Sequence, residues 1–231
     1  MEQKITRINL DGVNCYLVKA GDRFILFDTG GHLTNDRVFT NRRDALIKGL
    51  DNAGCKPGNL KLLILTHGDN DHTANATCIR DRYNVKIAMH RSDLELVESP
   101  ALEKVMGTFH YKSIKYKIMF LLMKKLFTKI TAKVLQEFER FTPDLFIDEG
   151  FDLSSYGLDA KILHIPGHTA GSIGILTSEG DLISGDIFIN ISKPYSAPNA
   201  YDFKKLNESV KRLKRMNIKA VYPGHGEPYI L

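Results

Sequence analysis

Residues 66–72 constrain the fold of this chain more than any other segment, because they place two imidazoles and two carboxylates within one short turn. The apolar residues 60–65 precede them and follow the turn sequence 56–59, a pattern that predicts a buried strand. We therefore expect the polar cluster where that strand ends, with a helix beginning near Thr73, as in many α/β folds. Imidazole suits zinc and iron, and carboxylate oxygens add negative charge. The segment thus predicts a metal site.

Three further polar residues come just after apolar, strand-like segments later in the chain, namely His168, Asp186 and His225. A polar loop whose histidines make ordinary hydrogen bonds would explain one such position. Ordinary hydrogen bonding explains less well why four separate segments each place such residues just after an apolar run. We therefore interpret the set as the ligands of a metal centre.

The pattern resembles that of the metallo-β-lactamase superfamily, whose signature is His-x-His-x-Asp-His followed by separate His, Asp and His ligands. Residues 13–18 and 25–31 also resemble the family's first strands and its Asp-Thr-Gly turn, so the match runs from about Asn14 to Gly226. The resemblance implies an α/β fold, a metallo-β-lactamase-like αββα four-layer sandwich. With 231 residues and 43% hydrophobic content, and with five residues after Gly226, we expect one domain over residues 1–231 and no appended flavin or helical domain.

The pattern of expected elements agrees with such a sandwich, because strands and helices alternate in two halves. Apolar runs predict strands at residues 5–9, 14–19, 24–28, 85–89, 161–165, 173–177 and 181–184. Helices are predicted at residues 41–52 and 203–216, the second one capped by Asp202.

The resemblance also implies a ligand set for two divalent metal ions. The first ion would be held by His67, Asp69 and His168, and the second by Asp71, His72 and His225, with Asp186 bridging the two. Asp69 stands where the family usually has its second histidine, which makes the motif a variant, His-x-Asp-x-Asp-His. Asp69 either ligates the first ion or only hydrogen-bonds a ligand or a metal-bound water.

The carboxylate at position 69 bears on the identity of the metal. Asp69, Asp71, Asp186 and one hydroxide would neutralise two divalent ions, whereas a histidine at 69 would leave one positive charge. More anionic ligation weakens a Lewis acid and favours harder ions such as iron or manganese. Flavodiiron proteins, a redox branch of the superfamily, similarly carry a carboxylate here. Zinc also accepts carboxylates, and it stays the favoured metal, with iron or manganese as alternatives.

The function implied is that of a dinuclear metal-dependent hydrolase with a small-molecule substrate. A bridging hydroxide would attack an ester, lactone or thioester-like bond, and Asp71 would be catalytic by passing a proton to the leaving group. Two alternatives stay open: a di-iron redox enzyme related to flavodiiron proteins but lacking the flavin domain, and a phosphodiesterase or nuclease. The net charge of +5 predicts affinity for polyanions but not catalysis on them. Because no appended RNA-binding element is expected, nucleic acid is not the expected partner.

Residues 92–148 resemble the family least, and we expect a helical cap inserted there between the two halves. Apolar residues at helical spacing predict one buried stripe, made of Ile114, Ile118, Leu122, Leu126, Ile130, Val134, Phe138 and Phe141. Seven lysines lie among them (Lys112, Lys115, Lys117, Lys124, Lys125, Lys129 and Lys133), and no acidic residue occurs between Lys104 and Glu137. The segment is therefore a basic amphipathic element.

Several functions fit this basic segment. It could cap the site and wall an apolar or acyl-bearing pocket, which we favour, meet an anionic lipid surface, or form an electropositive rim for a phosphate-bearing substrate. A buried stripe with a solvated lysine face explains the charges most simply. Candidate pocket aromatics, for which core packing is the default, are Phe109, Tyr111, Tyr116 and Phe120.

A few other residues have expected roles near the site. Asp28, in the Asp-Thr-Gly turn, should support the ligands by hydrogen bonding. Tyr195 should either stabilise an oxyanion or pack a loop. His90 is expected beside the ligands and His164 is expected to point away from them, whereas surface or lid positions are expected for His32 and His110.

Residues 1–7 lack the apolar core of a signal peptide, and no apolar run reaches transmembrane length, so we predict a cytoplasmic protein. Membrane-surface contact through the helical insertion stays an open alternative. Cys15, Cys55 and Cys78 are odd in number and widely spaced, which favours reduced thiols over a disulfide framework. The sequence does not predict the oligomeric state.

Overall fold

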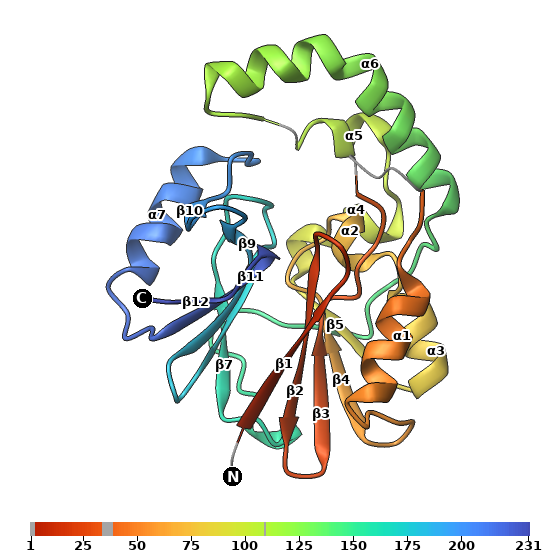
Figure 1. Ribbon diagram of the computed structural model, residues 1–231, viewed down its shortest axis with the longest axis vertical. Helices are drawn as coiled ribbons and strands as arrows, with labels where there is room; N and C mark the ends of the chain where they lie inside the picture. Colours follow the sequence, from red (N-terminus) through yellow and green to blue (C-terminus); the bar gives the residue numbers. More distant parts are fainter. Residues whose placement is uncertain (1–2, 34–38, 109) are drawn as a thin grey trace.

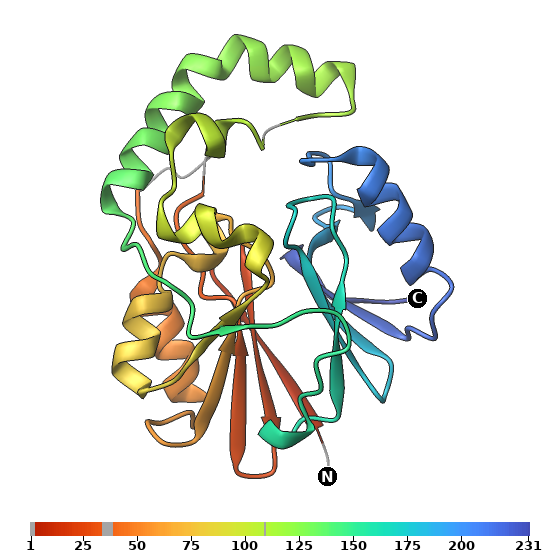
Figure 2. The same ribbon diagram turned by 180° about the vertical axis from the view of Figure 1, so that it is seen from behind.

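The first half of the chain forms a mixed sheet covered by two helices. The structure is a computed structural model, and it describes residues 3–33, 39–108 and 110–231 (Figure 1). The strands of this sheet follow chain order: β1 (Gln3–Asn9), β2 (Asn14–Ala20), β3 (Arg23–Phe27), β4 (Leu60–Ile64), β5 (Ile87–Met89) and β6 (Leu145–Phe146). Pairing is antiparallel from β1 to β3 and parallel from β3 to β6. The helices α1 (Arg43–Asn52) and α3 (Ala76–Tyr83) lie on its outer side (Figure 2).

The second half forms another sheet with a helix of its own. Its strands are β7 (Ala160–His164), β8 (Ile173–Thr177), β9 (Asp181–Asn190), β10 (Tyr195–Ser196), β11 (Ala220–Gly226) and β12 (Tyr229–Ile230). Their order is β12-β11-β9-β8-β7, and β10 pairs with β9. Helix α7 (Phe203–Leu213) follows β10 and covers the outer face of this sheet. The short helix η2 (Ser154–Tyr156) lies between the two halves of the chain.

Three apolar clusters hold the four layers together, and β4 shows how its sequence divides between two of them. Leu60 and Leu63 pack with residues of α1 and α3, whereas Leu62 and Ile64 pack between the two sheets. A continuous apolar run is what a strand buried on both faces requires. The third cluster joins the second sheet to α7. The predicted αββα four-layer sandwich is therefore confirmed.

Helix α7 begins as its sequence predicts. The Asp202 carboxylate accepts hydrogen bonds from the backbone N–H groups of Lys204 (2.8 Å) and Lys205 (3.1 Å), which satisfies two donors of the first turn. The observed helix ends at Leu213, three residues before the predicted end.

The predicted strand 181–184 is too short, because β9 continues to Asn190. This places Asp186 inside a strand and not in the loop after one. His225 likewise lies inside β11. The parallel pairing of β9 with β11 shifts register on both sides of Pro223. Such irregularities let strand residues aim side chains at a site.

The segment 92–148 is mostly helical, as predicted. It continues from η1 (Arg91–Asp93) into α4 (Leu94–Glu98), α5 (Leu102–Met106) and the long helix α6 (Ile114–Glu137), which arches over one end of both sheets (Figure 1). It also contains a strand that the sequence reasoning missed, β6, which extends the first sheet by pairing with β5.

The prediction of one buried stripe along this segment is wrong for the first half of α6. Val134, Phe138 and Phe141 are buried, but Ile114, Ile118, Leu122 and Leu126 are 76%, 54%, 80% and 49% exposed. The reason is geometric. Residues four apart are offset by about 40° around an α-helix, so a long row at that spacing winds from one side of the helix to the other.

Among the helices that the structure describes, none is long and apolar enough to cross a lipid bilayer. Cys15, Cys55 and Cys78 are free thiols, as predicted; the first two are buried and the third is half-buried.

Candidate metal centre

The segment 66–72 leaves the end of β4 and places four polar side chains at the gap between the two sheets. His67 and Asp69 lie in the loop that follows β4, and Asp71 and His72 lie on the one-turn helix α2 (Asn70–Thr73). His67 and His72 are buried, with their rings 4.2 Å apart between centroids. The predicted loop and helix at this strand end are confirmed, although the helix starts three residues earlier than expected.

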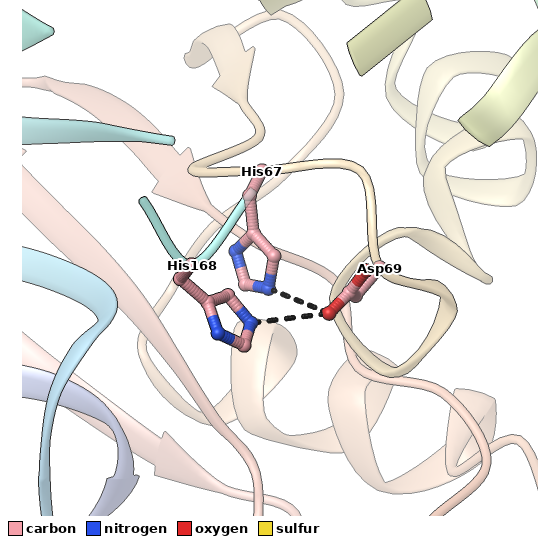
Figure 3. Close-up of side chains that lie close together, drawn as sticks. All are labelled: His67, Asp69 and His168. Atoms are coloured by element: carbon pink, nitrogen blue, oxygen red, sulfur yellow. Dashed lines mark hydrogen bonds and ion pairs between the residues drawn. The ribbon is translucent and has the colours of Figure 1, made fainter. Parts of the chain in front are cut away.

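Asp69 lies between two imidazoles, which point toward its carboxylate (Figure 3). Its Oδ2 atom is 3.1 Å from Nε2 of His168 and 3.7 Å from Nε2 of His67. Nε2 of His168 is also 3.7 Å from Oδ2 of Asp186. The carboxylate at position 69 thus occupies the place that a third ligand of one ion would take.

A second group forms around His225. Its Nε2 atom is 3.0 Å from Oδ2 of Asp186 and 3.4 Å from Oδ2 of Asp71. Nε2 of His72 lies 3.3 Å from Oδ1 of Asp186 and 3.9 Å from Oδ2 of Asp71. Asp186 therefore contacts imidazoles of both groups, through both of its oxygens.

The donor atoms of the two groups fit a pair of divalent ions. Ligand atoms of a tetrahedral ion with bonds of about 2.1 Å lie roughly 3.4 Å from one another. The contacts above, from 3.0 to 3.9 Å, are close to that spacing. Moreover, Nε2 of His67 and Oδ1 of Asp186 are buried without a hydrogen-bond partner. Since buried polar atoms are rarely left without partners, these two atoms indicate a cation at the site.

The protonation of the histidines agrees with a site built for cations. Burial, together with the neighbouring His72, lowers the pKa of His67 to about 4, which keeps that imidazole neutral and able to ligate. Burial alone would also lower the pKa of His168 and of His225. The hydrogen bond with Asp69 instead raises the pKa of His168 to about 9, and the charge of Asp186 raises that of His225 to about 10. The carboxylates thus make the pocket strongly favourable for positive charge.

Asp28 supports the ligands, as predicted. Its Oδ2 atom lies 2.9 Å from Nδ1 of His72 and accepts a hydrogen bond from the Thr66 hydroxyl (2.8 Å), which in turn lies 3.0 Å from Nδ1 of His67. Its Oδ1 atom accepts from the backbone N–H of Thr66 (2.8 Å). One buried carboxylate therefore orients two imidazoles, which is the usual role of a group behind metal ligands.

Two backbone carbonyls orient the remaining imidazoles, and no sequence pattern indicated these contacts. Nδ1 of His168 lies 3.3 Å from the carbonyl oxygen of Asn199, and Nδ1 of His225 lies 2.5 Å from that of Gly12. In each case the ring nitrogen that faces the site is Nε2. The tautomers that leave a lone pair on Nε2 are those that donate from Nδ1.

Asp93 is a further buried carboxylate that the sequence analysis missed. It accepts hydrogen bonds from the backbone N–H groups of Gly68 (2.8 Å) and Gly171 (2.7 Å), and from the hydroxyl of Thr169 (2.6 Å). It thereby ties the loop of His67 to the loop of His168. Burial raises the pKa of this carboxyl to about 6, although the three hydrogen bonds act in the opposite direction.

Gly224 explains why β11 can approach the ligands so closely. A Cβ atom there would lie 2.0 Å from Oδ1 of Asp186 and 2.7 Å from Cε1 of His72. Only a residue without a side chain fits between these two groups.

A third histidine pair lies outside the candidate metal centre. The rings of His90 and His164 stack, with centroids 4.1 Å apart and planes at 11°. Nδ1 of His90 accepts the N–H of Ser92, and its Nε2 lies 3.2 Å from Asp148, whereas Nε2 of His164 lies 3.0 Å from the carbonyl of Ala170. His164 points away from the ligands as predicted. The expectation that His90 lies beside the metal ligands is wrong, because its contacts are with Ser92, Asp148 and His164.

The ligand cluster opens into a cavity of about 1070 Å³. Polar residues of the metal centre lie at its base: Asp69, Asp71, His168, Asp186 and His225. Apolar residues of α6 form its opposite wall: Met119, Met123, Leu126, Phe127 and Ile130. Helix α6 therefore forms one wall of the cavity.

The pocket aromatics differ in part from the expected set. Tyr111 lines the cavity, but Tyr116, Phe120 and Tyr195 are not among its described lining residues. Phe109 lies outside the residues that the structure describes. His32 is buried and lines the cavity, which corrects its expected surface position, and His110 is exposed, as expected.

A model of the metallo-beta-lactamase superfamily matches residues 8–225. The chain therefore belongs to the metallo-beta-lactamase superfamily, as its sequence and fold predict. It is a metal-dependent hydrolase of that class.

Individual relatives agree with this membership. A probable metallo-hydrolase of Methanocaldococcus jannaschii, MJ0888, is 29% identical over 219 residues, which cover 93% of this chain and 87% of the relative. The hydroxyacylglutathione hydrolase GloC of Haemophilus influenzae is 31% identical over 133 residues, which cover 56% of this chain and 50% of GloC. The solved structure of TTHA1623 in a di-iron-bound form has a TM-score of 0.63 and 24% identity, and the match covers 98% of this chain and 94% of that one. This last similarity concerns the fold.

Proposed function

We propose that the chain is a dinuclear metal hydrolase that cleaves an ester, lactone or thioester-like bond in a small molecule with an apolar acyl part. The observation that carries this proposal is the cavity, in which the histidine and aspartate cluster faces an apolar wall from α6. A pocket with one polar end and one apolar side suits a substrate whose reactive group and acyl chain lie apart.

In this proposal His67, Asp69 and His168 would hold one ion, Asp71, His72 and His225 would hold the other, and Asp186 would be a ligand shared between them. Bound divalent ions would lower the pKa of a water molecule and stabilise developing negative charge. The residues behind the ligands fix the imidazoles before substrate arrives. Asp71 borders the cavity, where its carboxylate can take up a proton and return it to the leaving group. Zinc is our first candidate for the metal.

The relatives support this substrate class without defining it. The name of GloC gives hydroxyacylglutathione as its substrate, an acyl-bearing compound, and about half of each chain aligns. We therefore include acyl thioesters with esters and lactones among the substrates to test.

The test combines metal analysis with single substitutions. We expect about two ions per chain in protein purified without chelator, and losses of at least about 100-fold in kcat/KM for His72→Ala and Asp186→Asn on the best substrate found. His110→Ala, which changes an exposed histidine outside the cluster, is the matched control and should keep wild-type turnover. Unchanged turnover in the His72 or Asp186 variant would refute the ligand assignment.

A second candidate function is di-iron redox chemistry, and the position of Asp69 favours it. A carboxylate between His67 and His168 makes the first donor set harder than three imidazoles would. Two irons per chain, with consumption of oxygen or nitric oxide and no hydrolysis, would put this candidate first. The phosphodiesterase alternative has weaker support, since among the described lining residues Arg7 is the sole arginine or lysine.

We also propose that residues 1–231 form one domain in which residues 92–148 cap the cavity. The location in the cytoplasm stays a prediction, and cell fractionation with an antibody to the chain would test it.

A further inference from the structure

Helix α6 has an apolar surface on each of two opposite sides. One side lines the cavity through residues such as Met119 and Met123. The other carries four exposed aliphatic side chains, which we call the outer patch: Ile114, Ile118, Leu121 and Leu122, the last two 72% and 80% exposed. Leu121 and Met123 are about 160° apart around the helix. Because apolar faces of helices are normally buried, a helix with apolar residues on two sides is expected to pack against something on each side.

The outer patch is surrounded by positive charge. Lys117, Lys124, Lys125 and Lys129 flank it and are exposed. Within the part of the chain that the structure describes, none of these four lysines is joined to a carboxylate by an ion pair, and the sequence has no acidic residue between Lys104 and Glu137. The surface is thus aliphatic and cationic, and residues 114–136 of α6 contain no acidic side chain that could neutralise it.

The combination of aliphatic side chains and lysines favours one kind of binding partner for the outer patch over others. A second copy of the chain, docked by the same patch, would oppose lysines to lysines, because a two-fold interface brings identical surfaces together. A nucleic acid would satisfy the lysines but leave four isoleucine and leucine side chains in water. An anionic lipid surface takes both, since aliphatic side chains enter the acyl boundary while lysine ammonium groups reach the headgroups.

We propose that the outer patch of α6 docks on the surface of anionic lipid bilayers. Helix α6 would lie in the plane of the interface, with Ile114, Ile118, Leu121 and Leu122 inserted and the flanking lysines at headgroup phosphates. The inner side of the same helix keeps its place in the cavity wall. Docking therefore needs no rearrangement of the candidate metal centre.

Vesicle co-sedimentation tests the proposal directly. We expect the wild-type chain to bind phosphatidylcholine vesicles that contain phosphatidylglycerol at least about tenfold more tightly than pure phosphatidylcholine vesicles, and to be released by high salt. Leu121→Ser/Leu122→Ser should weaken binding by removing insertion. Lys124→Glu/Lys125→Glu should weaken it at least about tenfold by reversing two charges.

The matched control reverses two exposed lysines elsewhere, Lys204→Glu/Lys205→Glu on α7, with the same change in net charge. It should keep most of the binding. All three variants should unfold at the wild-type temperature, because the replaced side chains are exposed. The proposal is overturned if the wild type does not bind anionic vesicles or if the α7 control loses as much binding as the α6 variant. It is also overturned if the Leu121/Leu122 variant loses self-association, measured by sedimentation equilibrium, and keeps vesicle binding. None of these readouts depends on turnover.

Discussion

Two buried carboxylates behind the site, Asp28 and Asp93, hold the ligand-bearing loops in place. Asp28 could be predicted, because residues 28–30 resemble the Asp-Thr-Gly turn of the family. It adopts a φ of 61°, a left-handed conformation that aspartate tolerates better than most residues. Asp93 could not be predicted. Its partners are mostly backbone N–H groups of loops distant in sequence, and the amino-acid sequence contains no pattern that indicates such contacts.

The raised pKa of Asp93 leads to a pH-dependent prediction. Its carboxyl titrates at about 6 in the folded chain and near 4 when unfolded, so its contribution to stability is fully present below pH 4 and is lost as the pH rises through 6. Asn does not titrate. In metal-free protein, the destabilisation caused by Asp93→Asn should therefore grow by about 1 kcal/mol as the pH falls from about 7.5 to 5. Urea unfolding at several pH values measures this difference, and a difference that is independent of pH would contradict the assigned pKa.

At the scale of elements, α6 shows what periodicity can and cannot predict. The apolar spacing predicted a helix over this region, and a helix of 24 residues is present. The spacing could not tell which side faces the body, because the row winds around the helix and both sides carry apolar residues. Likewise, Asp186 and His225 were each predicted as a ligand, but each was expected in the loop after a strand. Both residues lie within strands. The sequence could not show this, because the irregular pairing of β9 with β11 joins two segments that are far apart in sequence.

The cavity wall of α6 predicts a specific effect on substrate choice. Met119→Ser/Met123→Ser replaces two apolar side chains of the wall with small polar ones and leaves the ligands unchanged. Each apolar side chain that contacts an acyl chain contributes on the order of 1–2 kcal/mol. We therefore expect kcat/KM to fall at least about tenfold for octanoyl esters and to change little for acetyl esters. The Leu121→Ser/Leu122→Ser variant is the control, and an equal loss on both esters would contradict the assignment of the wall.

At the scale of the whole molecule, the candidate metal centre joins the two halves of the sandwich. The loop after β4 supplies His67 and Asp69, and helix α2 supplies Asp71 and His72, whereas the second half of the chain supplies His168, Asp186 and His225. The fold class and the family could be predicted because the sequence resembles the family's motifs, and the same resemblance named the residues that the structure brings together in this cluster. The supporting contacts from Gly12, Asn199 and Asp93 depend on tertiary structure and were not predicted.

Metal removal should accordingly lower the stability of the entire chain. Each ion that binds only the folded state adds about 2.7 kcal/mol when its free concentration is a hundred times its Kd. We expect the thermal midpoint to fall after chelation and to recover with added zinc, manganese or iron. Calorimetry measures the shift, and His225→Ala should show a smaller one. A midpoint that chelation leaves unchanged, in protein shown to contain metal, would contradict this prediction.

The distribution of the ligands over both sheets has a further consequence for a chain cut between β6 and β7. Each fragment would carry one sheet and an incomplete donor set: the first with His67, Asp69, Asp71 and His72, the second with His168, Asp186 and His225. Neither fragment could complete the coordination of either ion alone. Reassembly of the two pieces would then depend on metal, because only the assembled pair completes the coordination of each ion and each bound ion links the two fragments.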